Sequence, residues 1–223
     1  AIKGQIRQVQ ITKIDRRHIE ARDMALIQPS PNEMEIPYQA IPGAPYATLP
    51  YESQQAFKQN EVLQLLNRIG KIEAEPRFDT YLASPSLWHY RNKMEYTFSN
   101  KRWLYDGENI EDLPHTNALG FHAPGRFDKV LPIVKCWLQD DMGNHIRNFV
   151  FDYCIENELS FYDLKEHTGL MRNLMLRNTK AGDWMINVVF AKNEDQNIQK
   201  LMQAIHDRFS PKALNYCINE KMN

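Results

Sequence analysis

Six prolines between positions 29 and 50 constrain the fold of this chain more than any other feature of its sequence. They are Pro29, Pro31, Pro37, Pro42, Pro45 and Pro50. Each proline fixes φ and removes a backbone N–H, so a segment this rich in proline does not form a regular helix or a central strand. The segment therefore predicts a domain boundary or an irregular binding loop. It divides the 223 residues into a short first part and a long second part.

The short first part has the pattern of a β-hairpin. In Gly4–Ile14, Val9 and Ile11 are spaced by two, as in a strand, and Ile19–Ile27 is the expected return strand. A two-stranded hairpin is only marginally stable by itself. This part therefore predicts a piece of a larger β-structure.

The long second part alternates strand and helix patterns. Strands are predicted over Tyr90–Ser99, Leu119–His122, Val130–Val134, Leu170–Arg177, Trp184–Phe190 and Ala213–Ile218, and helices over Ser53–Ile69, Asp140–Asn157 and Glu194–Phe209. Gly70 stands where a helix C-terminal glycine is expected. This order predicts an α+β fold with a central mixed or antiparallel sheet and helices on one side of it.

Composition excludes several classes of protein. The chain is 43% hydrophobic, has no run of 18 apolar residues and shows no signal peptide at its start, so neither disorder nor a membrane span is expected. The net charge of −1 means that any basic surface must be local. Cys136, Cys154 and Cys217 form no CxxC pair and suit a reducing cytoplasm. Because both ends look cut, we expect a piece of a longer cytoplasmic protein.

The sequence lacks the common catalytic motifs. It has no G-x-G-x-x-G loop after a strand, no H-E-x-x-H and no G-x-S-x-G. His115 and His122 are interpreted as ordinary loop histidines, and Cys154 as a core residue. We therefore predict no catalytic residue and no metal site in this chain.

One segment has an unusual composition. Residues Trp88–Trp103 interleave aromatic side chains with four cations and one acid. Aromatic rings stack on bases and cations neutralise phosphates, although the same pattern also fits a strand whose rings pack in the core. Further cations follow at Arg126 and Lys129 and at Arg172 and Arg177. The last two are five positions apart, which places them on opposite faces of a strand unless a bulge intervenes.

Four blocks of sequence around these residues resemble the RNA uracil-5 methyltransferases that modify rRNA and tRNA. The blocks are "YRNKMEYTFSNKRW", "ALGFHAPGRFDKVLPIVKCWLQDD", "GLMRNLMLRNTKAGDWMINVVF" and "LNYCINEKMN". They occur in the order and spacing of the family. With "LPYESQQAFKQNEVLQLLNRIG" before them, the resemblance covers about Pro29–Asn223.

The resemblance implies a domain organisation and an activity. Family members have an OB-like barrel, a central α+β domain that helps to recognise RNA, and a C-terminal domain that binds S-adenosylmethionine and carries the catalytic cysteine and glutamate. Residues 1–28 then correspond to the end of the OB-like (TRAM-type) barrel, 29–50 to a linker and 51–223 to the central RNA-recognition domain. The methyl donor would be bound by the missing domain, none of the three cysteines would be catalytic, and the chain alone would be inactive.

The sequence departs from the family at one place. Many members hold an iron–sulfur cluster through a C-G-G-C region and one later cysteine. The matching region here, "EIPYQAIPGAPYATLPY", has no cysteine, and only Cys136 matches the later ligand. A cluster normally takes four cysteines, so no iron–sulfur cluster is expected.

The resemblance also selects candidate RNA-binding residues. These are Arg91, Asn92, Lys93, Lys101, Arg102, Arg126, Lys129 and Arg172. Arg91 and Asn92 have a structural alternative, which is pairing with Asp140–Asp141 or capping of backbone groups, and Arg177 is expected to be a surface or structural residue. RNA is the expected partner, with 23S rRNA favoured over tRNA, and a monomer is expected. A stand-alone RNA-binding module without catalysis and a protein-interaction domain remain alternatives.

Overall fold

The computed structural model describes residues 2–36, 41–105 and 107–221. The chain forms two compact units, Ala1–Ser84 and Pro85–Asn223. Most of the proline-rich segment falls in the first unit as turns without helix or strand, although Pro37 lies outside the described residues. Among the residues that the structure describes, no helix is long and apolar enough to cross a membrane.

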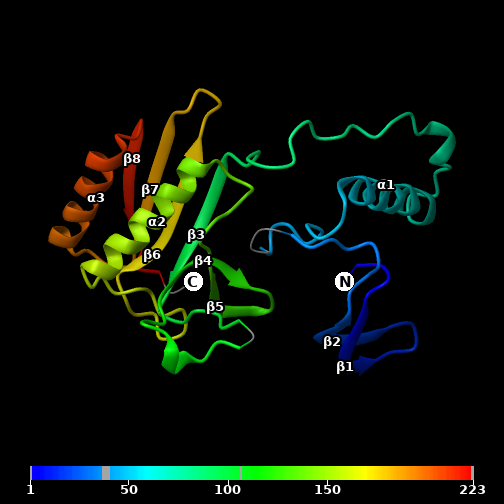
Figure 1. Ribbon diagram of the computed structural model, residues 1–223, viewed down its shortest axis with the longest axis horizontal. Coiled ribbons are helices and arrows are strands. Elements are labelled where there is room, and N and C mark those ends of the chain that lie inside the picture. The colour runs from blue at the N-terminus through cyan, green and yellow to red at the C-terminus, as the bar shows by residue number, and fades with distance from the viewer. Residues whose placement is uncertain (1, 37–40, 106, 222–223) are drawn as a thin grey trace. The chain divides into compact units, whose positions relative to one another are not determined.

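The first unit contains a β-hairpin and one long helix (Figure 1). Strands β1 (Ile6–Ile14) and β2 (Ile19–Gln28) pair antiparallel, as the alternation predicts. Helix α1 spans Tyr51–Arg68 and is followed by a short 3-10 turn, Glu75–Arg77. The assignment of the hairpin to a barrel remains a prediction.

Helix α1 departs from the sequence prediction in two respects. None of its residues is buried, although Ala56, Leu63 and Leu66 are spaced in the sequence as on one apolar stripe of a helix. The left-handed position after the helix is occupied by Lys71, with φ of 54°, and not by Gly70. Gly70 meets a different requirement, because a Cβ there would lie 2.7 Å from the carbonyl oxygen of Leu66.

The second unit is built on a six-stranded sheet in the order β5-β4-β3-β6-β7-β8. All neighbours are antiparallel except β7 and β8, which are parallel. The strands are β3 (Lys93–Ser99), β4 (Ala118–Ala123), β5 (Arg126–Pro132), β6 (Met171–Asn178), β7 (Trp184–Phe190) and β8 (Ala213–Ile218). A short 3-10 turn, Ile110–Asp112, precedes β4.

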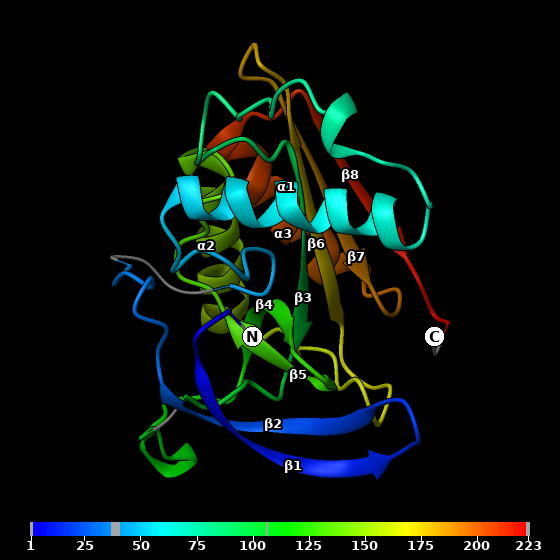
Figure 2. The ribbon, with the colours of Figure 1, turned by 90° about the vertical axis from the view of Figure 1, so that its right-hand side faces the viewer.

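Two helices pack on one face of this sheet, α2 (Asp141–Glu156) and α3 (Asp195–Phe209), as Figures 1 and 2 show. The side chain of Asp140 accepts a hydrogen bond from the Met142 N–H and caps α2. The helices bury their apolar faces against alternate residues of the strands, such as Tyr96 and Phe98 of β3. The α+β fold with a mixed sheet and helices on one side is therefore confirmed.

The opposite face of the sheet, called the open face below, is exposed or half-buried. Strand register assigns twelve residues of four adjacent strands to it. These are Lys93, Glu95 and Thr97 of β3, Asn173, Met175 and Arg177 of β6, Met185, Asn187 and Val189 of β7, and Ala213, Asn215 and Cys217 of β8. Since side chains of a strand alternate between faces, each of these positions neighbours a residue that points to the helix side.

Candidate nucleic-acid interface

The backbone before β3 is fixed by contacts with the segment before α2. The N–H of His89 donates to the carbonyl of Trp137 at 2.9 Å, and the N–H of Arg91 donates to Leu138 at 2.8 Å. The His89 ring nitrogen Nδ1 lies 2.9 Å from the carbonyl oxygen of Gln139. These contacts hold the exposed side chains of Tyr90 and Arg91 on a defined backbone.

Three candidate residues lie at this end of β3. Arg91, Asn92 and Lys93 are all exposed. Lys93 is 3.8 Å from Glu95 on the same strand, which is a weak contact between side chains that are both about half exposed. Among the described residues, no carboxylate forms an ion pair with Arg91.

The acids that offered a structural partner for Arg91 make other contacts. Asp140 caps α2. Asp141 pairs with Lys135 at 3.1 Å, and the hydrogen bond from this lysine lowers the pKa of the Asp141 carboxyl. The expected pairing with Asp140–Asp141 is therefore not found in the described part of the chain.

At the opposite end of β3 the candidate cations are ion-paired. Lys101 contacts the buried Asp163 at 2.8 Å, and Arg102 holds Glu108 through two hydrogen bonds of 2.8 and 2.9 Å. Burial of Asp163 opposes its ionisation. Hydrogen bonds from Lys101 and from two backbone N–H groups outweigh that effect and hold the pKa of Asp163 well below its usual range.

The two candidates in strand β5, Arg126 and Lys129, differ from one another. Arg126 forms a two-pronged ion pair with the buried Asp128, both contacts being 2.8 Å, and Lys165 adds a third contact at 3.1 Å. The hydrogen bond from Arg126 holds the pKa of Asp128 well below its usual range. Lys129 is half-buried, and no ion pair of its ammonium group is found among the described residues.

Arg172 is held by backbone groups that follow β8. Its Nη1 donates to the carbonyls of Asn219 and Lys221, both at 2.6 Å, and its guanidinium lies 4.5 Å from the centre of the Tyr162 ring. The pairing of β6 with β7 shifts by one residue between Met171 and Asn173. In a regular strand, side chains five positions apart point to opposite faces. The extra residue of this bulge shifts that alternation by one, so that Arg172 and Arg177 can share a face.

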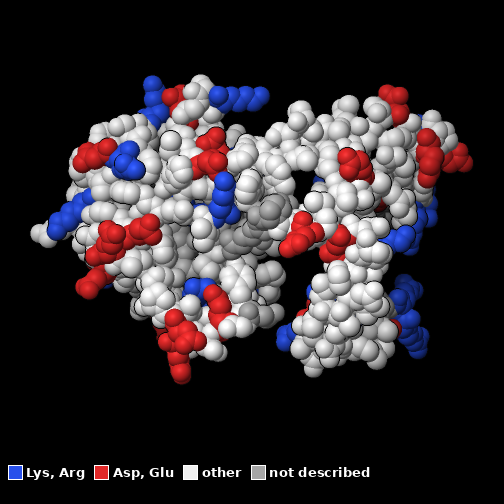
Figure 3. All heavy atoms as spheres, viewed as in Figure 1, with Lys and Arg blue, Asp and Glu red and all other residues white. Residues whose placement is uncertain are grey.

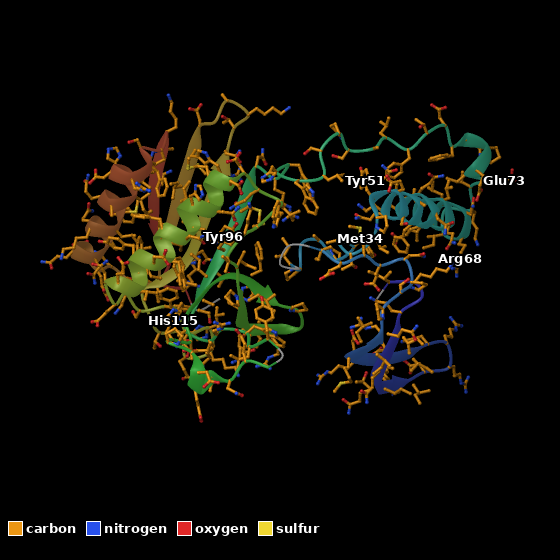
Figure 4. All side chains as sticks on the ribbon, in the orientation of Figure 1. Met34, Tyr51, Arg68, Glu73, Tyr96 and His115 are labelled. Atoms are coloured by element: carbon orange, nitrogen blue, oxygen red, sulfur yellow. The ribbon has the colours of Figure 1, made fainter. Side chains whose placement is uncertain are left out.

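The aromatic residues of the Trp88–Trp103 segment divide between core and surface. Tyr96, labelled in Figure 4, and Phe98 are fully buried, and the Arg147 guanidinium of α2 lies 5.3 Å from the Tyr96 ring. Trp88 makes an edge contact with Trp137 at 6.3 Å. Tyr90 is 55% exposed and can stack on a base. The core interpretation is therefore correct for Tyr96 and Phe98.

The candidates fall into two groups, one at each end of β3. Arg91, Asn92 and Lys93 form the first group, and the remaining candidates lie near or beyond the other end, about 20 Å away for a seven-residue strand. On the face of the second unit that Figure 3 shows, basic and acidic side chains are interspersed. Any basic surface on this face is therefore local.

Sequence reasoning did not identify Asp128, Asp163 and Glu108 as partners of the predicted RNA-binding cations. A signal existed only for Asp128, because it lies two residues after Arg126 and alternation places both on one side of β5. Asp163 is far from Lys101 in the sequence, so only the fold brings them together.

The cysteines do not form a cofactor site. Cys136 and Cys154 are buried and Cys217 is exposed. Desolvation raises the pKa of the Cys154 thiol far above its usual range. Among the residues that the structure describes, the one group of three His, Cys, Asp or Glu side chains close enough to share a metal ion is Asp15, His18 and Glu20. It contains no cysteine, so the residues described do not fit an iron–sulfur cluster.

The Asp15–His18–Glu20 group is exposed and already has a cation. The ammonium group of Lys13 lies 2.8 Å from Asp15 and 3.8 Å from Glu20. It neutralises part of the charge that a metal ion would need. The group is therefore best described as an ion-pair network at the turn of the hairpin.

Comparison with known proteins gives a consistent assignment. No family model matches the chain. An uncharacterized RNA methyltransferase of Bacteroides thetaiotaomicron is 40% identical over 100% of this chain, and one of Porphyromonas gingivalis is 36% identical over 96% of it. The chain spans 51% and 48% of these two relatives, or about half of their length.

A solved structure supports the fold. The Pyrococcus abyssi tRNA (uracil-54, C5)-methyltransferase, in complex with S-adenosyl-L-homocysteine, matches with a TM-score of 0.65 at 16% identity. The match covers 97% of this chain and 44% of the archaeal one. Over its whole length the chain is therefore similar in sequence to proteins named RNA methyltransferases, and it corresponds to about half of their length.

Proposed function

We propose that this chain is the RNA-recognition part of an S-adenosylmethionine-dependent RNA uracil-5 methyltransferase of the cytoplasm. The observation that carries the proposal is sequence similarity over the whole chain to proteins named RNA methyltransferases. The archaeal enzyme of similar fold acts on uracil C5, which supports the choice of base. In the parent enzyme, a thiolate would add to C6 of the flipped uracil and C5 would take the methyl group from S-adenosylmethionine, which leaves as S-adenosylhomocysteine. A base would then remove the C5 proton as the C6–S bond breaks and the thiolate is released.

We expect none of the three cysteines of this chain to be catalytic in that reaction. Cys136 and Cys154 are buried, and Cys217 is an exposed residue of the edge strand β8. The chain has no glycine-rich loop between a strand and a helix to hold the methyl donor. We expect radiolabelled methyl transfer to be absent when this chain is incubated with S-adenosylmethionine and RNA. Transfer above background would contradict the assignment of catalysis to another part of the parent.

The chain would contribute RNA binding through the group at the start of β3. Arg91 and Lys93 are exposed beside the exposed ring of Tyr90, and hydrogen bonds to the segment before α2 hold their backbone in place. Cations at such positions supply phosphate contacts, and an exposed ring supplies stacking.

The first test is fluorescence anisotropy of the chain with a uridine-containing 23S rRNA hairpin across a salt series. We expect binding that weakens steeply with salt, with a slope of about 0.7–0.9 per phosphate contact in a plot of log K against log salt concentration. Binding that does not change with salt or with RNA sequence would favour the protein-interaction alternative. A tRNA T-arm of the same length used as competitor tests the proposed preference for 23S rRNA.

The second test replaces both Arg91 and Lys93 by Ala. The RNA dissociation constant should rise and the thermal midpoint should stay within about 2 °C, because neither side chain has a strong partner. The matched control is Lys200→Ala with Arg208→Ala, two exposed cations of α3 on the other side of the sheet. Equal affinities in the two double variants would remove the proposed role of Arg91 and Lys93.

A further inference from the structure

The open face has an uneven distribution of charge. Of its twelve residues, nine are uncharged, among them Asn187, Asn215 and Met175. The three charged residues, Lys93, Glu95 and Arg177, all lie in neighbouring positions of β3 and β6. Among these twelve residues, the charge is therefore confined to one corner, where β3 begins and β6 ends.

Two of these charges have the same sign and face each other. Lys93 and Arg177 are direct partners in the antiparallel pairing of β3 with β6. Directly opposite residues of such a pair have Cβ atoms about 4.5–5.5 Å apart, and like charges in this position are destabilising. The fold therefore retains an unfavourable pair at an exposed position where uncharged residues would be tolerated.

The nearby acid relieves only part of this repulsion. Glu95 lies 3.8 Å from Lys93. No ion pair of Arg177 is found within the described ranges of the chain, and the residue is exposed. Three other arginines near this sheet, Arg102, Arg126 and Arg172, have carboxylate or carbonyl partners. Arg177 differs from these three, because its guanidinium has no such partner among the residues that the structure describes.

We propose that Lys93 and Arg177 bind one phosphodiester group of RNA between them on the open face, with Arg91 beside them. A phosphate placed between the two side chains converts their repulsion into two attractive contacts, and the planar guanidinium of Arg177 can hold two phosphate oxygens at once. This inference rests on the proposed function and adds a residue, Arg177, that the sequence assigned to a surface or structural role.

The chemical nature of the ligand follows from the charges of Lys93 and Arg177 and from the uncharged surface beside them. A negatively charged ligand is required by the cations of the corner. The adjoining uncharged half-exposed strip, with amide side chains at Asn187 and Asn215, leaves room for the sugar and base of a nucleotide. An acidic protein segment would fit the corner but has no further charge to contact on this strip.

The experiment measures RNA affinity and thermal stability in the same variants. Arg177→Gln should weaken binding of the uridine-containing hairpin by about 3–10-fold at low salt and reduce the salt slope by about 0.7–0.9, which is one phosphate contact. Arg177→Glu should weaken binding further while leaving the thermal midpoint unchanged or higher, because a carboxylate would then face Lys93. Arg208→Gln on α3 is the control and should change neither quantity.

The outcomes separate this inference from the proposed function. If the wild-type chain binds RNA with salt dependence but Arg177→Gln behaves as Arg208→Gln does, the phosphate site is wrong and the RNA-binding role stands. If the wild-type chain does not bind RNA at low salt, both fall. A thermal midpoint lowered by Arg177→Gln and by Arg177→Glu alike would show that Arg177 has a structural role, and would overturn the proposal.

Discussion

Single residues decide whether a cation of this chain supports the fold or is available to a ligand. Arg102 and Arg91 occupy the same aromatic and basic segment and cannot be ranked from the sequence. The structure separates them, because the Arg102 side chain is 14% exposed and holds Glu108, whereas Arg91 is exposed and has no ion pair in the described part of the chain. The sequence shows that both residues are arginines, but only the fold shows which of them has a carboxylate beside its guanidinium.

This difference predicts that two alanine substitutions destabilise the fold to different extents. Arg102→Ala should lower the free energy of unfolding of the second unit by about 1–3 kcal/mol, because it removes charge-assisted hydrogen bonds from a partly buried site. Arg91→Ala should change it by less than about 0.5 kcal/mol. Urea unfolding followed by tryptophan fluorescence measures both. A larger loss for Arg91→Ala than for Arg102→Ala would contradict this assignment.

A second residue-scale prediction concerns Asp163. Because its pKa is lower in the folded chain than in the unfolded one, its ionised form stabilises the fold above the unfolded value of about 3.9, and that stabilisation is lost as the pH falls below it. Asp163→Asn should therefore lower the thermal midpoint at pH 7.

The difference in thermal midpoint between Asp163→Asn and the wild-type chain should become smaller as the pH is lowered from about 5 to 3. The measurement is differential scanning calorimetry across this range. Glu166→Gln, a change at an exposed residue beside the site, is the control and should show a much smaller gap. If the difference in thermal midpoint stayed constant with pH, the substitution would destabilise the fold through lost packing at Asp163 and not through the lost negative charge.

At the scale of elements, the sequence predicts the regular structure of the second unit closely. The strands Trp184–Phe190 and Ala213–Ile218 have the predicted bounds, and α2 and α3 differ from the prediction only by their cap residues. Hydrophobic periodicity carries this information for β7, α2 and α3 because each of them buries one face. It fails for α1, where the apolar stripe does not correspond to buried residues.

Glycine positions within strands carry information that periodicity does not. Gly120 lies in β4 opposite β5, and a Cβ at this position would overlap the carbonyl oxygen of Leu131. Gly120→Ala should cost at least about 2–3 kcal/mol, because the two strands must move apart. Gly182→Ala is the control, since its surroundings are empty and only its φ of 86° is strained, at about 1–2 kcal/mol.

Chemical denaturation of the two glycine variants compares these costs. If Gly182→Ala proves the more destabilising, close approach of β4 and β5 does not decide the choice of glycine at position 120.

At the scale of the whole molecule, the two units differ in how much they bury. Of the buried hydrophobic residues in the described part of the chain, Ile41, Leu49 and Ala74 belong to the first unit and all the others to the second. Several apolar side chains of the hairpin, among them Ile14 and Ile27, are more than 60% exposed. The division at Ser84 and Pro85 is not marked in the sequence, because it depends on contacts and not on composition.

The difference in burial predicts that the two units unfold separately. Stability scales with the apolar surface removed from water, so the first unit should open at lower temperature or denaturant concentration than the second. Limited proteolysis at low protease concentration should first cleave within residues 2–84 and leave a fragment that begins near Pro85. Mass spectrometry identifies the fragment, and circular dichroism tests whether it keeps a cooperative thermal transition.

The same fragment tests where RNA binds. Because Arg91, Lys93 and Arg177 all belong to the second unit, a folded fragment should retain the salt-dependent part of RNA binding that these residues supply. The matched comparison is the fragment carrying Arg177→Gln, which should lose one phosphate contact as the full chain does. Simultaneous cleavage of both units, or a fragment without a cooperative transition, would show that the second unit depends on the first for its stability.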